Sequence, residues 1–178
     1  MSCRRLHCQE FNRARATGRE NIKIKELINM KIPESIQHEL DGWDNGGIDL
    51  ESWVSLKGNF KLAVGYSAVY WPEFVEFNGY ILKGGFSNSS LEGFEKQLSG
   101  DRQSIEAVMN HLHIEDIQGV QCKDGSDDKF IYLGSTLKDI YETKLARQFP
   151  TKSFHVSFEV PEDPLDLTGY EITFWQLP

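Results

Sequence analysis

The chain has 178 residues, of which 39% are hydrophobic and 12% aromatic, so it can build a packed core and is not disordered throughout. It contains 27 acidic and 19 basic residues, and no stretch of about 18 apolar residues that would predict a membrane-spanning helix. The length favours one domain, or one domain with a tail.

The charges are unevenly distributed along the chain. Residues 1–29 hold seven basic and three acidic side chains, which leaves 12 basic and 24 acidic side chains, a net charge of −12, for residues 30–178. Because nucleic acids and anionic lipids are bound mainly through Lys and Arg, this acidity argues against nucleic-acid and membrane partners. A basic protein partner fits it better.

We interpret residues 1–29 as a basic tail, disordered or loosely docked, that precedes a single α+β domain at 30–178. The tail lacks the apolar segment of a secretory signal, and its acidic residues argue against a transit peptide. Cys3 and Cys8 flank His7, but no second cluster completes a zinc site. A low, odd cysteine count without a signal peptide indicates a cytoplasmic protein.

The first part of the domain predicts mainly helices. An initial proline, early acids and two apolar residues on one face predict a short helix over 33–40. Residues 48–56 are apolar without a clear period, so their structure stays open. Residues 59–70 favour a helix that starts at Asn59 and ends before Pro72, although their apolar residues also fit a strand.

Residues 74–83 predict a β-hairpin. Asn78 and Gly79 form the turn, because this dipeptide accepts positive φ at both positions. Pairing around the turn sets Phe77 opposite Tyr80 and gives the hairpin one apolar face and one mixed face.

Helices and strands alternate in the second part of the domain. The predicted elements are a helix at 90–98, a helix from Asp101 to Leu112, strands at 129–133, 154–160 and 170–175, and a helix that starts at Ser135 or Thr136 and stops before Pro150. The last two strands alternate apolar and polar residues, which is typical of an antiparallel sheet with one buried face. The sequence therefore predicts an α+β fold: a mostly antiparallel sheet of about five strands, packed on one side by two or three helices.

His111 and His113 are the strongest candidates for metal or acid–base chemistry, because Glu106, Glu115 and Asp116 are near them in sequence. Two positions apart on a helix, however, the two imidazoles point in different directions. We therefore interpret them as a solvated helix end.

No catalytic motif stands out elsewhere. The acidic loops at 44–49 and 124–128 do not match the EF-hand pattern, and the sequence has no nucleophile elbow, Walker A loop or GxGxxG motif. We expect no catalytic residue, no metal and no cofactor. The alternative is a small enzyme or ligand-binding domain whose site is assembled from His111, His113 or His155 and nearby carboxylates.

Aromatic residues are concentrated between positions 53 and 80, where carboxylates accompany them, a pattern typical of protein-binding surfaces. The predicted binding residues are Trp43, Trp53, Tyr70, Trp71, Glu73, Glu76 and Trp175. The sequence thus favours a non-enzymatic acidic binding module, such as an inhibitor, an antidote or immunity-like protein or an adaptor, which engages a basic protein. A homodimer through the sheet is compatible with either interpretation.

Overall fold

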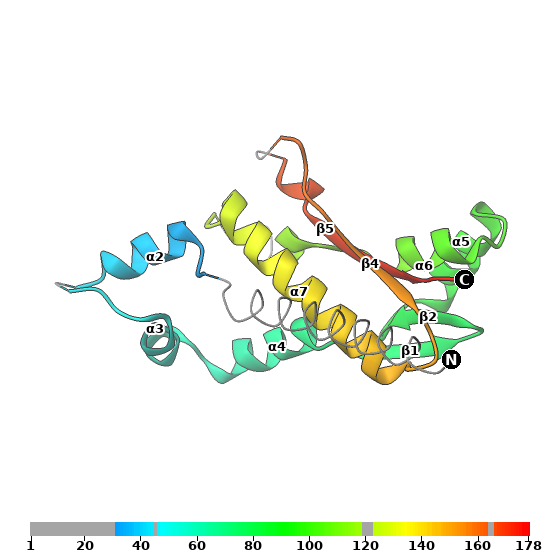
Figure 1. The fold of residues 1–178 in the computed structure, drawn as a ribbon, viewed down its shortest axis with the longest axis horizontal. Helices are drawn as coiled ribbons and strands as arrows, with labels where there is room; N and C mark the ends of the chain where they lie inside the picture. The colour runs from blue at the N-terminus through cyan, green and yellow to red at the C-terminus, as the bar shows by residue number, and fades with distance from the viewer. Residues whose placement is uncertain (1–30, 45, 119–122, 164–165) are drawn as a thin grey trace, which may run out of the picture. The chain divides into compact units, whose positions relative to one another are not determined.

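A computed structural model of the chain describes residues 31–44, 46–118, 123–163 and 166–178. The described residues form six α-helices, two short 3₁₀ helices and five strands in two antiparallel sheets, so the fold is α+β (Figure 1). The predicted tail at 1–29 and Cys122 lie outside these residues. No helix in the described part of the chain combines the length and hydropathy needed to cross a bilayer.

The elements follow the chain in a mixed order. The helices are α2 (Glu34–Asp41), α3 (Leu50–Lys57), α4 (Phe60–Tyr70), α5 (Asn88–Gln97), α6 (Arg102–Met109) and α7 (Asp127–Gln148). The 3₁₀ helices are η1 (Ile114–Ile117) and η2 (Leu167–Gly169). The strands are β1 (Phe74–Phe77), β2 (Tyr80–Lys83), β3 (Leu112–His113), β4 (Phe154–Glu159) and β5 (Glu171–Gln176).

The predicted helix starts are confirmed where a polar side chain caps them. Asn59 Oδ1 accepts a hydrogen bond from the Leu62 N–H at 2.9 Å, and Asp101 Oδ2 accepts one from the Ser104 N–H at 3.2 Å. The helix after Asp101 ends at Met109, earlier than predicted, because the chain enters β3 at Leu112.

The predicted hairpin is also confirmed. Phe77 pairs with Tyr80, and Asn78 and Gly79 adopt φ angles of 51° and 84°. Its apolar face covers a small cluster built on Leu82, whereas the mixed face contributes Phe74 and Ile81 to the main core. The hairpin therefore separates two clusters of buried side chains.

The predicted strand at 129–133 is wrong, because these residues form the first turns of α7. The buried residues of α7 recur every three or four positions, as on one side of a helix: Phe130, Gly134, Leu137, Tyr141 and Leu145. Asp127 and Asp128 in its first turn complement the positive end of the helix dipole.

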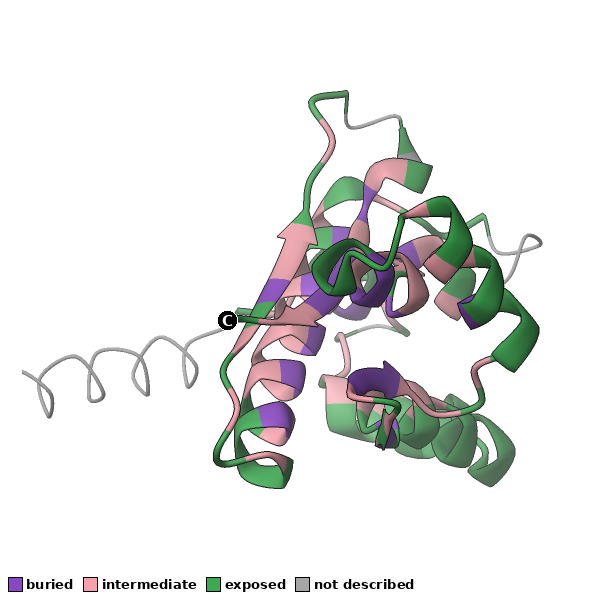
Figure 2. Cartoon of the chain, turned by 90° about the vertical axis from the view of Figure 1, so that its right-hand side faces the viewer, coloured by how far each residue is buried: buried purple, intermediate pink, exposed green. Residues whose placement is uncertain are grey.

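The prediction of one sheet of about five strands is wrong as well. The strands form a two-stranded sheet, β1-β2, and a three-stranded sheet in the order β3-β5-β4. Helix α7 packs on the face of the larger sheet that carries Val156, Ile172 and Phe174 (Figures 1 and 2). Thr173 points to the other face and donates to the carbonyl of Ala107 in α6, so helices cover both faces.

Glu106 is one of two buried polar side chains of the α6 segment that lie between the two sheets. Its carboxylate is fully buried and accepts hydrogen bonds from the backbone N–H of Ile81 in β2, at 2.7 Å, and of Gln176 in β5, at 2.6 Å. It also accepts one from the side-chain amide of Gln176. One carboxylate thus satisfies donors from both sheets.

Asn110, one helical turn later, does the same with its amide. Its Nδ2 donates to the carbonyls of Ile81, at 2.9 Å, and Phe174, at 3.2 Å, while its Oδ1 accepts from the Lys83 N–H at 2.9 Å. These bonds satisfy backbone groups of β2 and β5 that a strand-to-strand ladder would otherwise satisfy. The two sheets are therefore joined through side chains, and this is why they do not merge.

Helix α2 is attached to the start of α7 through Asp128. The Asp128 carboxylate accepts hydrogen bonds from the N–H and hydroxyl of Ser35, at 2.9 and 3.0 Å, and from the hydroxyl of Ser126 at 2.6 Å. Burial raises the pKa of Asp128, but these bonds and one from the Lys129 N–H outweigh it and lower that pKa to about 2.

We predict that Glu106→Ala destabilises the protein by roughly 3 kcal/mol, because it leaves buried N–H donors without an acceptor. The free energy of urea unfolding measures this. Glu92→Ala on the exposed side of α5 is the control, with an expected change within about 0.5 kcal/mol. Equal effects of the two substitutions would show that the carboxylate does not hold the sheets together.

We predict that Gly134→Ala destabilises the protein by about 1–3 kcal/mol despite the better helix propensity of alanine. A Cβ at this position would overlap the ring of Phe158 in β4. Gly65→Ala in α4 is the matched control, because a Cβ there meets nothing within 4 Å and is expected to stabilise the helix slightly. Urea unfolding of both variants tests the contact, which is refuted if Gly134→Ala is also stabilising.

We predict that Asp128 contributes to acid unfolding between its ordinary pKa of 3.8 and its folded pKa of about 2. Because the folded pKa is lowered, its stabilisation is complete above pH 3.8 and is lost as the pH falls towards 2. The free energy of unfolding of Asp128→Asn should therefore change less steeply over this range than that of the unchanged protein. Parallel pH profiles of the two proteins would contradict this assignment.

Candidate functional site

Helices α3 and α4 carry large apolar side chains that the rest of the described chain does not cover. Neither helix contains a buried residue. We define the α3–α4 surface by its large exposed side chains: Val54, Leu56, Phe60, Leu62 and Val64. Phe60 is 92% exposed, Val64 69% and Leu56 63%. An apolar helix is normally buried, so this degree of exposure is unusual for side chains of this kind.

The C-terminal end of α4 is attached to the body of the protein. Tyr70 packs against the main core, and the Tyr66 hydroxyl donates to Gln118 Oε1 at 2.9 Å. Lys144 of α7 donates to the carbonyls of Trp71 and Pro72, and its Nζ lies 4.8 Å from the centre of the Trp71 ring. The C-terminal end of α4 is thus fixed to the body, and the residues of the α3–α4 surface precede this end in the chain.

The predicted aromatic residues lie in several parts of the fold. Trp43 follows α2 and lies under Lys57, whose Nζ is 5.0 Å from the ring centre. Trp53 is half-buried in α3, and Tyr70 and Trp71 lie at the end of α4. Trp175 lies in β5 and contacts His155, with 4.6 Å between ring centres. The structure therefore brings Tyr70 and Trp71 together but places Trp175 on the larger sheet.

The two predicted carboxylates differ in their surroundings. Glu76 forms an ion pair with Lys152 at 2.9 Å, which links β1 to the segment before β4. Glu73 directly follows Pro72, is exposed and lines a pocket between the end of α4 and the end of β2. Of the two, Glu73 is the one that lines this pocket.

The three candidate histidines do not converge on one site. The rings of His111 and His113 are 5.3 Å apart, edge to face, and each Nδ1 lies within hydrogen-bonding distance of a backbone carbonyl. His113 also lies 3.9 Å from Glu171, whereas the His155 ring is in tilted contact with the Trp175 ring. Within the described residues, no group of three His, Cys, Asp or Glu side chains could hold a metal ion.

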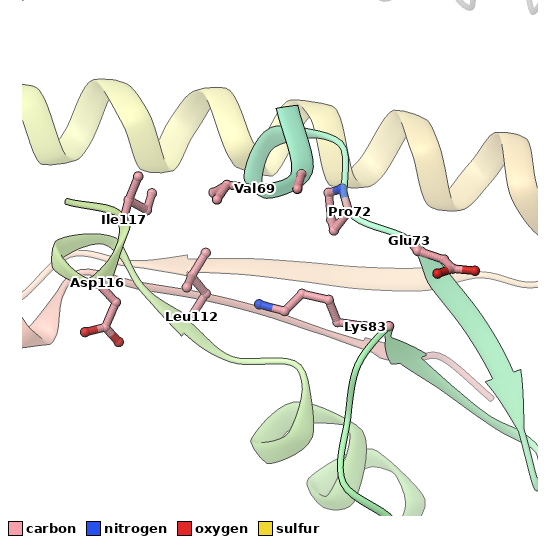
Figure 3. Close-up of a pocket in the computed structure, with 9 residues that line it drawn as sticks. Val69, Pro72, Glu73, Lys83, Leu112, Asp116 and Ile117 are labelled. Carbon is pink, nitrogen blue, oxygen red and sulfur yellow. The ribbon is translucent and has the colours of Figure 1, made fainter. Parts of the chain in front are cut away.

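A half-open pocket of about 340 Å³ lies between the end of α4, the end of β2 and the β3–η1 segment (Figure 3). We name it the Lys83 pocket. The side chain of Lys83 extends into it towards Leu112, and Val69, Pro72 and Ile117 line the opposite wall. The carboxylates of Glu73 and Asp116 flank the pocket and point away from the Lys83 ammonium group (Figure 3).

Lys83 is unusual among the half-buried lysines of the described chain. These are Lys83, Lys129, Lys138, Lys144 and Lys152. The other four donate hydrogen bonds through Nζ to carboxylate, amide or carbonyl oxygens. Nζ of Lys83 has no hydrogen-bond or ion-pair partner among the described residues. Burial lowers the pKa of the Lys83 ammonium group.

Sequence reasoning missed both features. The clearest available signal for the α3–α4 surface is the stretch 58–72, which carries a single charged residue, Lys61. The sequence offers no comparable signal for Lys83, because its burial depends on Val69 and Leu112, which are distant in the chain.

The chain matches no protein-family model, no curated protein and no solved structure. Its function is therefore inferred from its own surface and side chains.

Proposed function

We propose that this protein is a non-enzymatic binding module, of the inhibitor, antidote or adaptor kind, that engages a basic protein through the α3–α4 surface. The observation that supports this most directly is the exposure of five large apolar side chains on two consecutive helices. Exposed apolar patches of this kind are typical of surfaces that bind other proteins. The α3–α4 surface is thus the site of contact.

Phe60 is the residue that gains most from a partner. Removal of a Leu or Phe side chain from water contributes about 1.5–3 kcal/mol when it is complete. Because Phe60 is 92% exposed, nearly all of this contribution is still to be made. We expect Phe60 to be the centre of the interface, with Leu56 and Val64 around it.

Charge defines the chemistry of the partner. Residues 30–178 carry a net charge of −12, and the exposed acids Asp44, Asp49 and Glu51 precede the surface. Two basic side chains, Lys57 and Lys61, lie within it, so the negative charge comes from other parts of the chain. A complementary partner presents an apolar face bordered by Lys and Arg.

The same charge disfavours a second copy as the occupant. Two copies that met through the α3–α4 surface would bring two bodies of equal negative charge together, which opposes association most at low salt. A basic partner shows the opposite dependence, because its association is fastest at low salt. The salt dependence therefore distinguishes the two occupants.

The test uses the full chain with a photo-crosslinking amino acid at position 60, and at Val160 as a control. Val160 is 50% exposed on a different part of the surface, after β4. We expect a basic protein to be crosslinked from position 60 but not from 160. The crosslinked protein is then purified, and its dissociation constant is measured at 50 and 300 mM salt. Binding is expected to weaken with salt.

We predict that Leu56→Ser, Phe60→Ser and Val64→Ser together weaken this binding by roughly 100-fold, which corresponds to about 2.8 kcal/mol. Val160→Ser with Leu177→Ser, also at exposed apolar residues, should leave binding unchanged. Because all five residues are exposed, both variants should keep the stability of the parent protein.

Several results would overturn the proposal. They are equal binding by the two variants, a crosslink to a second copy of the chain or to no protein at all, and attachment to phospholipid vesicles that depends on Phe60.

A further inference from the structure

We propose that the Lys83 pocket binds a small organic acid with an apolar body and a single carboxylate. The carboxylate pairs with Nζ of Lys83, and the apolar body packs on Val69, Leu112 and Ile117. This inference does not depend on the proposed function, since the pocket and the α3–α4 surface use different side chains.

The shape of the pocket suits a small ligand. Its volume, about 340 Å³, lies at the lower end of the range of about 300–1,000 Å³ that is usual for ligand pockets. Most of its lining is apolar, and the polar groups are few (Figure 3). Such a pocket binds a ligand by burial of its apolar part and orients it by one polar contact.

Lys83 provides that polar contact. Its backbone N–H is held by Asn110 Oδ1 at 2.9 Å, so the residue has a fixed position at the end of β2. Its side chain runs into the pocket, where burial lowers the pKa of the ammonium group and no described oxygen compensates its charge. A ligand carboxylate would supply the missing partner and offset the cost of burial.

The flanking carboxylates limit the charge of the ligand. Glu73 and Asp116 lie on either side of the pocket and point away from Lys83 (Figure 3). Because they point away, they do not neutralise the ammonium group of Lys83. They do repel a second negative charge on the part of a ligand that extends out of the pocket. A monocarboxylate is therefore favoured over a dicarboxylate or a phosphate dianion.

Octanoate is a suitable probe, with octanamide and suberate as matched compounds. Octanamide has the same chain length without the charge, and suberate has a carboxylate at both ends. Titrations of the ¹⁵N-labelled full chain, followed by NMR, give the dissociation constants and the location of binding. We predict that octanoate shifts the signals of Val69, Lys83, Leu112 and Ile117, and that it binds at least 10-fold more tightly than octanamide or suberate.

The variant Lys83→Met tests the assigned ion pair, because methionine keeps an unbranched apolar chain and removes the charge. We expect Lys83→Met to weaken octanoate binding at least 10-fold while octanamide binding stays the same. Lys96→Met, at an exposed lysine of α5, is the control and should bind octanoate as the parent does. Thermal unfolding of both variants confirms that they are folded.

The proposal is overturned if octanoate does not bind, if Lys83→Met binds it as tightly as the parent, or if octanamide or suberate binds equally well. Shifts confined to the α3–α4 surface would also overturn it, since they would show that the probe binds the exposed apolar helices. That result would leave the proposed protein interface intact, so the two proposals can fail separately.

Discussion

The side chains of Glu106 and Asn110 hydrogen-bond to both β2 and β5, and these bonds fix how the two sheets lie on either side of α6. Both strands present backbone N–H and carbonyl groups towards α6, and buried groups of this kind require partners. A carboxylate and an amide one helical turn apart provide those partners for both strands at once. Helix α6 is thereby fixed between the two sheets, and it cannot be displaced without leaving these groups unpaired.

This arrangement also separates the two buried clusters. The main cluster lies between α7 and the larger sheet, and the smaller one lies between the hairpin, α5 and α6. Ile81 takes part in both the polar link and the main core, because its backbone bonds to Glu106 and Asn110 while its side chain is buried with Phe74. The polar link and the apolar packing therefore support each other at the same residue.

Local signals in the sequence were sufficient to predict part of this fold. Asn59 and Asp101 cap helices through their own neighbours, and Asn78 and Gly79 set the hairpin turn. The start of α7 could not be predicted in this way. Gly134 belongs to its buried side, but a glycine adds nothing to an apolar pattern, and its role is to make room for Phe158 from a distant strand.

The single predicted sheet failed for a related reason. The residues around Glu106 in the sequence fit two interpretations equally well. Its carboxylate could be buried and bonded to two strands, or it could be solvated near His111 and His113. The candidate surfaces show the same limit. An apolar pattern predicts which residues share a helix face, but it does not tell whether Phe60 or Val64 is covered by the same chain or by another one.

The pocket and the apolar surface meet at α4 but use different parts of it. The first turns of the helix carry Phe60 and Val64, whereas Val69 near its end lines the pocket. Tyr66, which lies between these two regions, and Tyr70, which directly follows Val69, attach the helix to the body. The two proposed sites thus use separate residues of one helix.

The absence of buried residues in α3 and α4 has a consequence for how such a protein diverges. Substitutions at positions such as Leu56 or Phe60 change the proposed recognition surface, but they leave both clusters of the interior untouched. Mutational drift at these exposed positions is therefore constrained by the proposed partner alone, whereas Tyr66 and Tyr70 stay constrained by their contacts with the body. Related chains could acquire new specificities there while Glu106, Asn110 and Gly134 preserve an unchanged scaffold.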